Sequence, residues 1–351
     1  MRVVDRILLK EIVRPLRTTF STSLGQKDVM KSVIVQIRLK DGLTGTGECP
    51  TSFAVKDETV AAIKCIIRDV SPQLKGLPIE AYGEKIGEFR RRFPQYPMTI
   101  SGLEVALFRA YLASAGRTEH AYFGGKLDVL ETDITIPYTT DINTIETWIE
   151  YAVRKGFTTY KFKVSGRLRD DANLISEVYR RLRDKMRAFT VRLDGNQGFT
   201  EKTCLDFFDF LVRNAYPVEL FEQPLRKDDY RGLRQIKKRS PVPIILDETV
   251  FTVTDLERAV EDNLCHGINI KIAKSGIDES LKLYKAAKKH GLKRMIGCMT
   301  ETMVGLSAGI DFAAGKGGFD YIDLDAVHFL YHCNTYGPMR IVGKSYILSG
   351  G

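Results

Sequence analysis

The sequence of 351 residues lacks a long apolar run, a paired cysteine motif and a cluster of histidines. No stretch approaches the roughly 18–20 apolar residues that a membrane-spanning helix needs. The six cysteines are scattered and form no CxxC pair, which argues against a disulfide framework or a zinc knuckle. The N-terminal segment carries charges throughout, unlike a secretory signal. These absences predict a cytoplasmic protein that has no membrane partner.

Two phosphate-binding signatures are also absent. The chain has no P-loop and no GxGxxG after its first parallel strand. The net charge is +9, but the basic residues are spread along the chain and mixed with acids, as in RRLRDKMR. Such a distribution is typical of a solvated surface, so we expect no nucleic-acid partner.

Residues 1–125 show strands followed by helices. Segments 32–42 and 42–50 have the pattern of two antiparallel strands with a turn at KDG, and helical patterns cover 57–74 and 100–116. This order predicts an α+β domain.

From residue 126 to 326, short β-rich segments alternate with amphipathic stretches of helix length. The β-rich segments are TDITIPYTT, TYKFKV, FTVRLDGN, PVELFEQP, VPIILDET, GINIKIAK, KRMIGCMT and DYIDLDAV. This alternation indicates parallel βαβ units, and eight strands with seven intervening helices predict a closed barrel. An open doubly wound sheet is the structural alternative. Residues 327–351 are too few for a domain, and we expect them to pack on the N-terminal one.

Acidic side chains end three consecutive strands of the predicted barrel. Asp194, Glu222 and Asp247 close the third, fourth and fifth strands. Because the carboxyl ends of barrel strands form the active-site face, these carboxylates should converge there. Converging carboxylates repel one another unless a cation lies among them, and oxygen-only ligands suit Mg²⁺. The pattern predicts a magnesium site, the alternative being three separate local salt bridges.

Lysines end the second and sixth strands, which lie opposite each other in a ring of eight. Lys163 and Lys271 should therefore face each other across the barrel mouth. Partial burial and nearby cations should lower the pKa of each lysine toward the range useful for a base. Lys161 shares a strand face with Lys163 and should supply such a cation and contact a substrate oxygen. The alternatives are solvated lysines on an edge strand, or a Schiff-base lysine, whose chemistry does not need three acids.

Together these groups suit removal of a proton α to a carboxylate. A metal would bind the substrate carboxylate, one lysine would take the proton, and nearby positive charge would stabilise the resulting enediolate. Return of a proton by the opposite lysine would invert the carbon.

The motifs YKFKV, DGNQG, FEQP, DET and NIKIAKSG resemble those of the enolase superfamily and, within it, the muconate-lactonizing-enzyme subgroup. The resemblance covers nearly the whole chain. It implies an α+β capping domain at 1–125, a (β/α)7β modified TIM barrel at 126–326 and a C-terminal return at 327–351. It also implies Mg²⁺ bound by the three carboxylates, with Lys163 and Lys271 as the two acid/base residues.

The subgroup includes muconate-type cycloisomerases, o-succinylbenzoate synthases, N-acylamino-acid racemases and dipeptide epimerases. The DLDA stretch favours a dipeptide epimerase. Asp323 and Asp325 share one strand face and resemble the aspartate pair with which these epimerases bind the free α-ammonium group of the substrate. Two carboxylates suit an ammonium group and disfavour an anionic substrate, although they could instead neutralise nearby lysines. IGCMTET is also similar to these epimerases.

The resemblance therefore implies an Mg²⁺-dependent isomerase that inverts the C-terminal residue of L-Ala-L-X-type dipeptides by two-lysine 1,1-proton transfer. Another reaction of the subgroup is the nearest alternative. A noncatalytic ligand-binding barrel is the alternative from a different class. The sequence leaves a homo-oligomer possible.

Loops at about 20–28 and 50–58 are where such epimerases contact the side chain of the second residue. The first loop lacks the arginine that Ala-Glu epimerases carry there, which argues against that specificity. Apolar side chains in these loops are Phe20, Phe53 and Val55, and cations are Lys27 and Lys56. We expect X to be hydrophobic or varied.

Three further residues at strand ends, Thr135, Cys298 and Thr300, are candidates to line the substrate site. An ordinary packing role is the alternative for each. Glu248 and Glu301 are candidates to orient the bases or the metal ligands, or to form structural salt bridges.

Overall fold

The computed structural model describes residues 2–332 and 336–348, and its centre is an eight-stranded parallel sheet. The strands are β5 (Ile134–Ile136), β6 (Thr159–Lys163), β7 (Thr190–Asp194), β8 (Phe221–Glu222), β9 (Ile244–Leu246), β10 (Gly267–Ile270), β11 (Lys293–Gly297) and β12 (Tyr321–Asp323). They follow one another in chain order around the sheet. The Asp133 N–H donates to the Ile322 carbonyl at 3.3 Å, which brings the last strand back to the first. The predicted barrel is confirmed.

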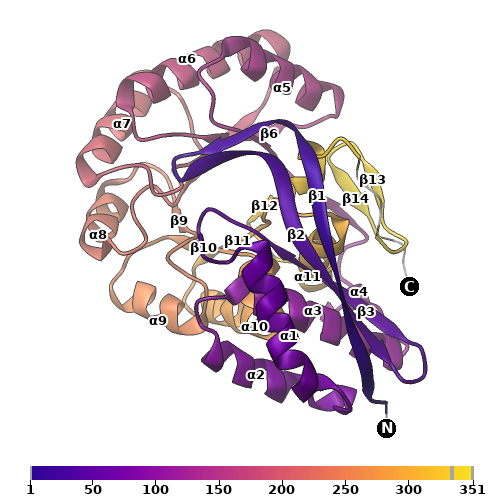
Figure 1. Cartoon of the computed structure of the whole chain (residues 1–351). Helices are drawn as coiled ribbons and strands as arrows, with labels where there is room; N and C mark the ends of the chain where they lie inside the picture. Colours follow the sequence, from indigo (N-terminus) through magenta and orange to yellow (C-terminus); the bar gives the residue numbers. More distant parts are fainter. Residues whose placement is uncertain (1, 333–335, 349–351) are drawn as a thin grey trace.

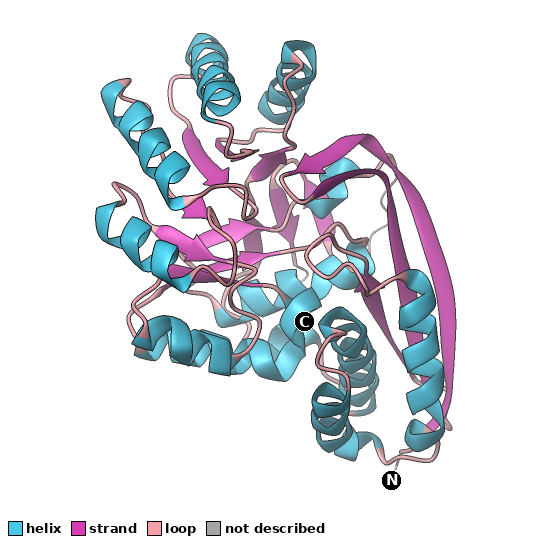
Figure 2. Ribbon diagram, turned by 60° about the vertical axis from the view of Figure 1, so that its left-hand side comes forward, coloured by secondary structure: helices cyan, strands magenta, loops and turns pink. Residues whose placement is uncertain are grey.

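Seven helices connect these strands and surround them (Figures 1 and 2). They are α5 (Ile142–Arg154), α6 (Leu168–Lys185), α7 (Glu201–Arg213), α8 (Tyr230–Arg239), α9 (Val253–Glu261), α10 (Ile272–Lys289) and α11 (Met303–Lys316). Their apolar residues recur at helical spacing; α5, for example, buries Ile145, Trp148, Ile149 and Ala152. This spacing places one apolar stripe of each helix against the sheet. Side-chain caps such as Asp141, which accepts the N–H of Asn143, fix where the helices begin.

The N-terminal part is an antiparallel sheet covered by helices. Its strands are β1 (Val4–Thr22), β2 (Gly25–Leu39) and β3 (Thr44–Pro50), and its helices are α1 (Val60–Leu74), the short 3-10 helix at Ile79–Ala81, α2 (Tyr82–Arg92), α3 (Pro97–Ser114) and α4 (Glu119–Phe123). The predicted strands at 32–42 and 42–50 correspond to β2 and β3. The sequence interpretation missed β1, whose many charged residues point to solvent while Val4, Ile12 and Leu16 are buried.

The C-terminal segment forms a small sheet with a strand that precedes the barrel. β13 (Arg340–Val342) pairs with β14 (Ser345–Ile347), and β14 pairs with β4 (Val129–Glu131). A 3-10 helix at Ala326–Phe329 follows β12. Residues 333–335 and 349–351 of the predicted C-terminal return lie outside the described residues. The domain boundaries at 125 and 326 stay predictions.

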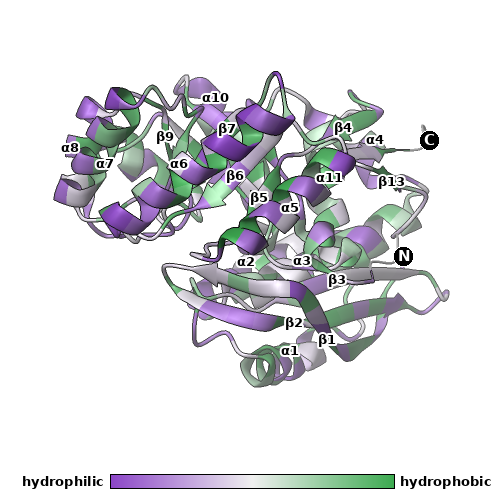
Figure 3. Cartoon of the chain, turned by 90° about the horizontal axis from the view of Figure 1, so that it is seen from above, coloured by the Kyte–Doolittle hydropathy of each residue, from purple (hydrophilic) through white to green (hydrophobic). Residues whose placement is uncertain are grey.

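The capping sheet lies across the mouth of the barrel, as the long β1–β2 hairpin shows in Figures 1 and 3. At the tip of the hairpin, the Ser23 hydroxyl donates to the carbonyl oxygen of Gly195 at 2.9 Å. Gly195 directly follows Asp194, so the hairpin contacts the chain beside a predicted metal ligand.

Buried polar groups also fasten the cap to the barrel. Glu48 of β3 accepts the N–H groups of Thr302 and Gly305 at 3.1 Å, at the start of α11. A carboxylate at a helix N-terminus is favourable because the backbone N–H groups there lack partners. On α3, the Ser101 hydroxyl donates to the carbonyl oxygen of Ile272, the residue after Lys271. The cap is therefore joined to two loops of the barrel mouth.

Within the described part of the chain, none of the helices is both long enough and apolar enough to cross a membrane.

We predict that Gly102→Ala destabilises the cap, because α3 packs against β3 through glycines. A Cβ at Gly102 would lie 2.6 Å from the Glu48 carbonyl oxygen and closer still to the Cys49 sulfur. Such overpacking costs about 1–3 kcal/mol. Urea unfolding should show a lower midpoint for this variant. Gly83→Ala is the matched control, since a Cβ there meets nothing within 4 Å; its midpoint should be unchanged or higher. Equal midpoints for both variants would contradict the close approach.

Candidate active site

A pocket opens at the carboxyl ends of the barrel strands, beneath the β1–β2 hairpin and the loop after β3. From the barrel it is lined by predicted site residues Thr135, Lys161, Lys163, Asp247, Lys271, Cys298, Thr300, Asp323 and Asp325. From the capping loops it is lined by Phe20, Thr22, Leu24, Lys27, Thr51, Ser52, Phe53 and Ala54. The structure therefore brings residues of both predicted loops and of the barrel to one cavity.

The three predicted metal ligands follow adjacent strands and are buried. Asp194 of β7 lies beside Glu222 of β8 in the ladder, and Asp247 follows β9, the next strand. Asn196 N–H donates to Asp194 Oδ1 at 2.9 Å, and Asn269 Nδ2 donates to Glu222 Oε1 at 2.7 Å. These hydrogen bonds fix the orientation of two of the carboxylates.

Lys161 lies among these acids, on the inward face of β6. Its Nζ is 2.5 Å from Glu222 Oε2, 3.1 Å from Asp194 Oδ2 and 2.7 Å from Asp323 Oδ2. The side chain is 1% exposed. Burial alone would lower the pKa of Lys161, but the surrounding carboxylates raise it well above its ordinary value. Lys161 is thus a fixed cation that joins the predicted metal ligands to Asp323.

Lys163 and Lys271 lie on strands that are four places apart in the sheet order, on opposite sides of the pocket. Lys163 Nζ is 2.6 Å from Asp194 Oδ2, and Lys271 Nζ is 2.7 Å from Asp247 Oδ2. The expectation of a lowered pKa is wrong for Lys271. Burial lowers it, but the carboxylates of Asp247 and Glu222 outweigh burial and raise it.

Lys274, a residue that the sequence analysis did not assign, holds Asp247 from a second side. Its buried Nζ donates to Asp247 Oδ1 at 2.7 Å and to the Asp247 carbonyl oxygen at 2.6 Å. Both oxygens of this carboxylate are therefore bound by lysines. The NIKIAK motif could have predicted this second lysine, because Lys274 lies one helical turn after Lys271 at the start of α10 and therefore on the same side of the helix.

Asp323 and Asp325 lie together at the end of β12, against Thr135. The Thr135 hydroxyl donates to Asp323 Oδ1 at 3.3 Å, and the Thr135 N–H donates to Asp325. Burial raises the pKa of Asp323, but Lys161 outweighs it and holds the pKa below the ordinary value. Asp325 has no such partner among the described residues, and burial together with Asp323 raises its pKa to about 7.

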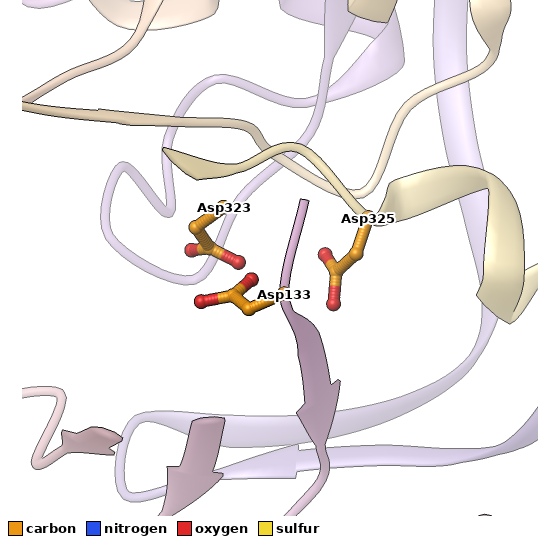
Figure 4. Close-up of side chains that lie close together, drawn as sticks. All are labelled: Asp133, Asp323 and Asp325. Atoms are coloured by element: carbon orange, nitrogen blue, oxygen red, sulfur yellow. The ribbon is translucent and has the colours of Figure 1, made fainter. Parts of the chain in front are cut away.

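A third aspartate, Asp133, approaches this pair from the start of β5 (Figure 4). One carboxylate oxygen from each of Asp133, Asp323 and Asp325 lies within 4.8 Å of the other two. The carboxylate oxygens of the three predicted metal ligands do not lie this close together. Their oxygens are bound by Lys161, Lys163, Lys271 and Lys274.

Glu248 and Glu301 are both buried, and neither forms an ion pair with a described residue. Glu248 lines the pocket and accepts a hydrogen bond from Asn196 Nδ2 at 3.3 Å. Burial and then Asp247 raise the pKa of Glu248 to about 8. Glu301 accepts the Met299 N–H at 3.1 Å, and burial and then Glu48 raise its pKa to about 8. Their orienting roles stay predictions.

Some predicted loop residues lie away from the pocket, and some residues of the site were missed. Val55 and Lys56 do not line the pocket, and Val55 pairs with Ser52 across the loop. Asp133 and Arg192 were missed, although each lies two residues before a predicted site residue on a strand. The alternation of strand side chains could have placed them on the inward face.

The buried groups of this site carry more acid than base. The acids are Asp133, Asp194, Glu222, Asp247, Glu248, Asp323 and Asp325, and the cations are Lys161, Lys163, Arg192, Lys271 and Lys274. Acids therefore outnumber cations in this site, and burial raises the pKa of some of the acids, among them Glu248 and Asp325. The atoms around the lysines that could act as metal ligands are carboxylate oxygens, which suit a hard cation such as Mg²⁺.

Two family models match the chain. The model described as "Enolase C-terminal domain-like" matches residues 144–350, and "Mandelate racemase / muconate lactonizing enzyme, N-terminal domain" matches residues 6–116. The chain belongs to the mandelate racemase/muconate lactonizing enzyme family of the enolase superfamily. The predicted resemblance is confirmed.

Curated relatives of this enolase-superfamily member are epimerases, which are isomerases. The L-Ala-D/L-Glu epimerase of Thermotoga maritima is 31% identical over 319 residues, covering 90% of this chain and 89% of the relative. The aromatic dipeptide epimerase of Herpetosiphon aurantiacus is 29% identical over 327 residues, covering 93% and 91%. The predictions of an enzyme and of an isomerase are confirmed.

Solved structures agree with this placement. The substrate-liganded L-Ala-D/L-Glu epimerase of Bacillus subtilis superposes with a TM-score of 0.92 at 28% identity, covering 99% of this chain and 97% of that one. The Enterococcus faecalis dipeptide epimerase, complexed with Mg and L-Leu-L-Tyr, gives a TM-score of 0.88 at 26% identity and the same coverage. The enolase-superfamily fold is therefore shared over the whole chain.

Proposed function

We propose that this isomerase is an Mg²⁺-dependent dipeptide epimerase that inverts the α-carbon of the C-terminal residue of L-Ala-L-X-type dipeptides. The observation that carries the proposal is the combination of two opposed lysines with the Asp323–Asp325 pair in one pocket. The names of the relatives and the dipeptide complexes of the solved structures support it. The cytoplasmic location and a homo-oligomeric state stay predictions.

Asp194, Glu222 and Asp247 are the residues that would hold Mg²⁺. They are buried and follow neighbouring strands. A divalent cation bound there supplies positive charge beside the substrate carboxylate, where negative charge develops in the reaction.

Lys163 and Lys271 are the proposed acid/base residues. A substrate bound between them exposes one face of its α-carbon to each ammonium group, because the two lysines come from opposite sides of the barrel. One lysine in its neutral form removes the α-proton, and the other, protonated, donates a proton to the opposite face. Asp194 and Asp247 hold the two side chains in place through their ion pairs.

Asp325 is the better placed of the two C-terminal aspartates to bind the substrate ammonium group. Asp323 is already paired with Lys161 at 2.7 Å, whereas Asp325 accepts a hydrogen bond from backbone and lies 4.0 Å from the Cys298 thiol. A buried carboxylate without a cation is costly, and an ammonium group of the substrate would relieve that cost. This favours a free N-terminus over an acylated one.

A panel of substrates with Mg²⁺ tests this function. Free L-Ala-L-X dipeptides should be epimerised, and N-acetylated amino acids should not react. X-L-Ala dipeptides test how strictly the enzyme requires alanine at the first position. Chiral chromatography of the products gives the readout. Turnover of N-acetylated amino acids but not of free dipeptides would favour the racemase alternative and overturn the role of Asp325. Tight dipeptide binding without turnover would instead favour a noncatalytic barrel.

The capping side of the pocket suggests what X is. Its walls include Phe20, Leu24 and Phe53, which suit an apolar side chain. The Lys27 ammonium lies 5.5 Å from the centre of the Phe53 ring and has no acidic partner among the described residues. Burial lowers the pKa of Lys27 to about 8, so the group is mostly a cation at pH 7. We propose that hydrophobic X is accepted and that Lys27 adds tolerance for acidic X.

We predict that Lys27→Met lowers kcat/KM for L-Ala-L-Glu roughly tenfold relative to L-Ala-L-Leu, about 1.4 kcal/mol, because it removes the cation but keeps the apolar stem. In the unmodified enzyme the relative activity on the acidic dipeptide should fall as pH rises through about 8, where Lys27 loses its proton. Lys56→Met is the control, since Lys56 is exposed and does not line the pocket. An unchanged ratio in Lys27→Met would exclude contact with X.

A further inference from the structure

Asp133 lies inside the barrel beneath the Asp323–Asp325 pair and does not line the pocket. Its side chain is 0% exposed. It precedes Thr135 by two residues, so both point to the barrel interior, with Thr135 at the mouth and Asp133 one layer below. Figure 4 shows the carboxyl groups of Asp323 and Asp325 directed toward it, with oxygens of all three within 4.8 Å of one another.

Arg192 lies on the other side of Asp133. Its guanidinium donates to Asp133 Oδ2 at 2.7 Å and to the Ile322 carbonyl oxygen at 3.0 Å, and it also pairs with Glu219 at 2.6 Å. The carboxyl groups of Asp133 and Asp323 also lie within hydrogen-bond distance of each other. Asp133 therefore lies between a buried cation and the two aspartates of the pocket.

This placement decides how much negative charge the pocket presents. Like charges this close repel one another, and a nearby cation offsets that repulsion. Lys161 pairs with Asp323, and Arg192 pairs with Asp133. Asp325 remains without a cation among the described residues. Without Asp133, Arg192 would keep Glu219 as its one acidic partner among the described residues, and Glu219 is partly exposed. The part of the Arg192 charge that Glu219 does not offset would act on Asp323 and Asp325 through a medium of low polarity and would oppose the binding of a second cation.

We propose that Asp133 is a positioning residue for the substrate ammonium group: by binding Arg192, it holds that guanidinium away from the Asp323–Asp325 pair and keeps the pair correctly placed. The inference rests on the proposed function, because it takes the ammonium group of a dipeptide as the ligand of that pair. It adds a residue that does not touch the substrate and that acts through the carboxylates above it.

Asp133→Asn in the full-length enzyme with Mg²⁺ tests this role. The amide keeps the shape of the side chain and can still accept a hydrogen bond from Arg192, but it leaves Glu219 as the one acidic partner of the guanidinium among the described residues. For the best free dipeptide of the panel, KM should rise roughly 10- to 100-fold, the range expected for one interaction with a charged group. The kcat should stay within about threefold, since the lysines are unchanged.

Two further measurements separate this role from a structural one. The inhibition constant of the corresponding N-acetylated dipeptide, which has no ammonium group, should not change in Asp133→Asn. The double variant Asp133→Asn with Arg192→Met removes both charges and should restore KM to within about threefold of the unmodified enzyme. Asp311→Asn, on the outer helix α11, is the matched control and should leave KM unchanged.

Equal losses of affinity for the free and the N-acetylated dipeptide would overturn the inference, as would a double variant no better than the single one. If the unmodified enzyme turns over free dipeptides and Asp133→Asn matches it, this inference fails and the proposed function stands. If the unmodified enzyme does not accept free dipeptides, the proposed function fails and this inference fails with it.

Discussion

The buried ammonium group of Lys161 is the interaction on which the rest of the site depends. With 1% of its side chain exposed, it lies within ion-pair distance of Asp194, Glu222 and Asp323. Without this cation, Glu222 and Asp323 would lose their one ion pair with a described residue, and Asp194 would keep only Lys163. A buried carboxylate without a cation is among the costliest arrangements in a protein interior. Lys161 therefore connects the acids proposed to hold metal with the acid pair proposed to hold the substrate ammonium group.

The architecture explains why so many charges can be buried together. Each barrel strand contributes one or two inward residues, and the short loops of the mouth supply backbone N–H donors, such as those of Asn196 and Thr135. The cap then covers the mouth from above and is fastened by Ser23, Glu48 and Ser101 to loops that carry site residues. In the proposed function, the barrel supplies the acid/base residues, whereas the hairpin and the loop after β3 contact the side chain of X.

Much of this arrangement could be predicted from the sequence, because the carboxyl ends of the strands in a barrel meet at one face. This convergence does not depend on which side chains fill the barrel interior. The regular alternation of strands and helices identified the barrel, and most of the polar residues predicted at its strand ends line one pocket, although Asp194 and Glu222 do not. β1 was missed, since its charged residues obscure the alternation that the buried Ile12 and Leu16 follow.

The sequence could not give the pairing of charges within the site. It predicted a lowered pKa for Lys271, but Asp247 lies close enough to outweigh burial, a distance that only the packed structure fixes. Asp133 and Arg192 contact each other from β5 and β7, two strands that are not neighbours, and no local pattern links them. Such pairs depend on the curvature of the closed barrel.

The central claim is that Lys163 and Lys271 act on opposite faces of one α-carbon, and exchange in D₂O tests it most directly. The unmodified enzyme with Mg²⁺ should place deuterium at the α-carbon of the C-terminal residue during epimerisation, as mass spectrometry and proton NMR would detect. Lys163→Ala and Lys271→Ala should each abolish epimerisation, yet each should still exchange the α-proton of one diastereomer, and the two variants should differ in which one. Epimerisation without deuterium uptake, or exchange of both diastereomers by either variant, would contradict the two-lysine account.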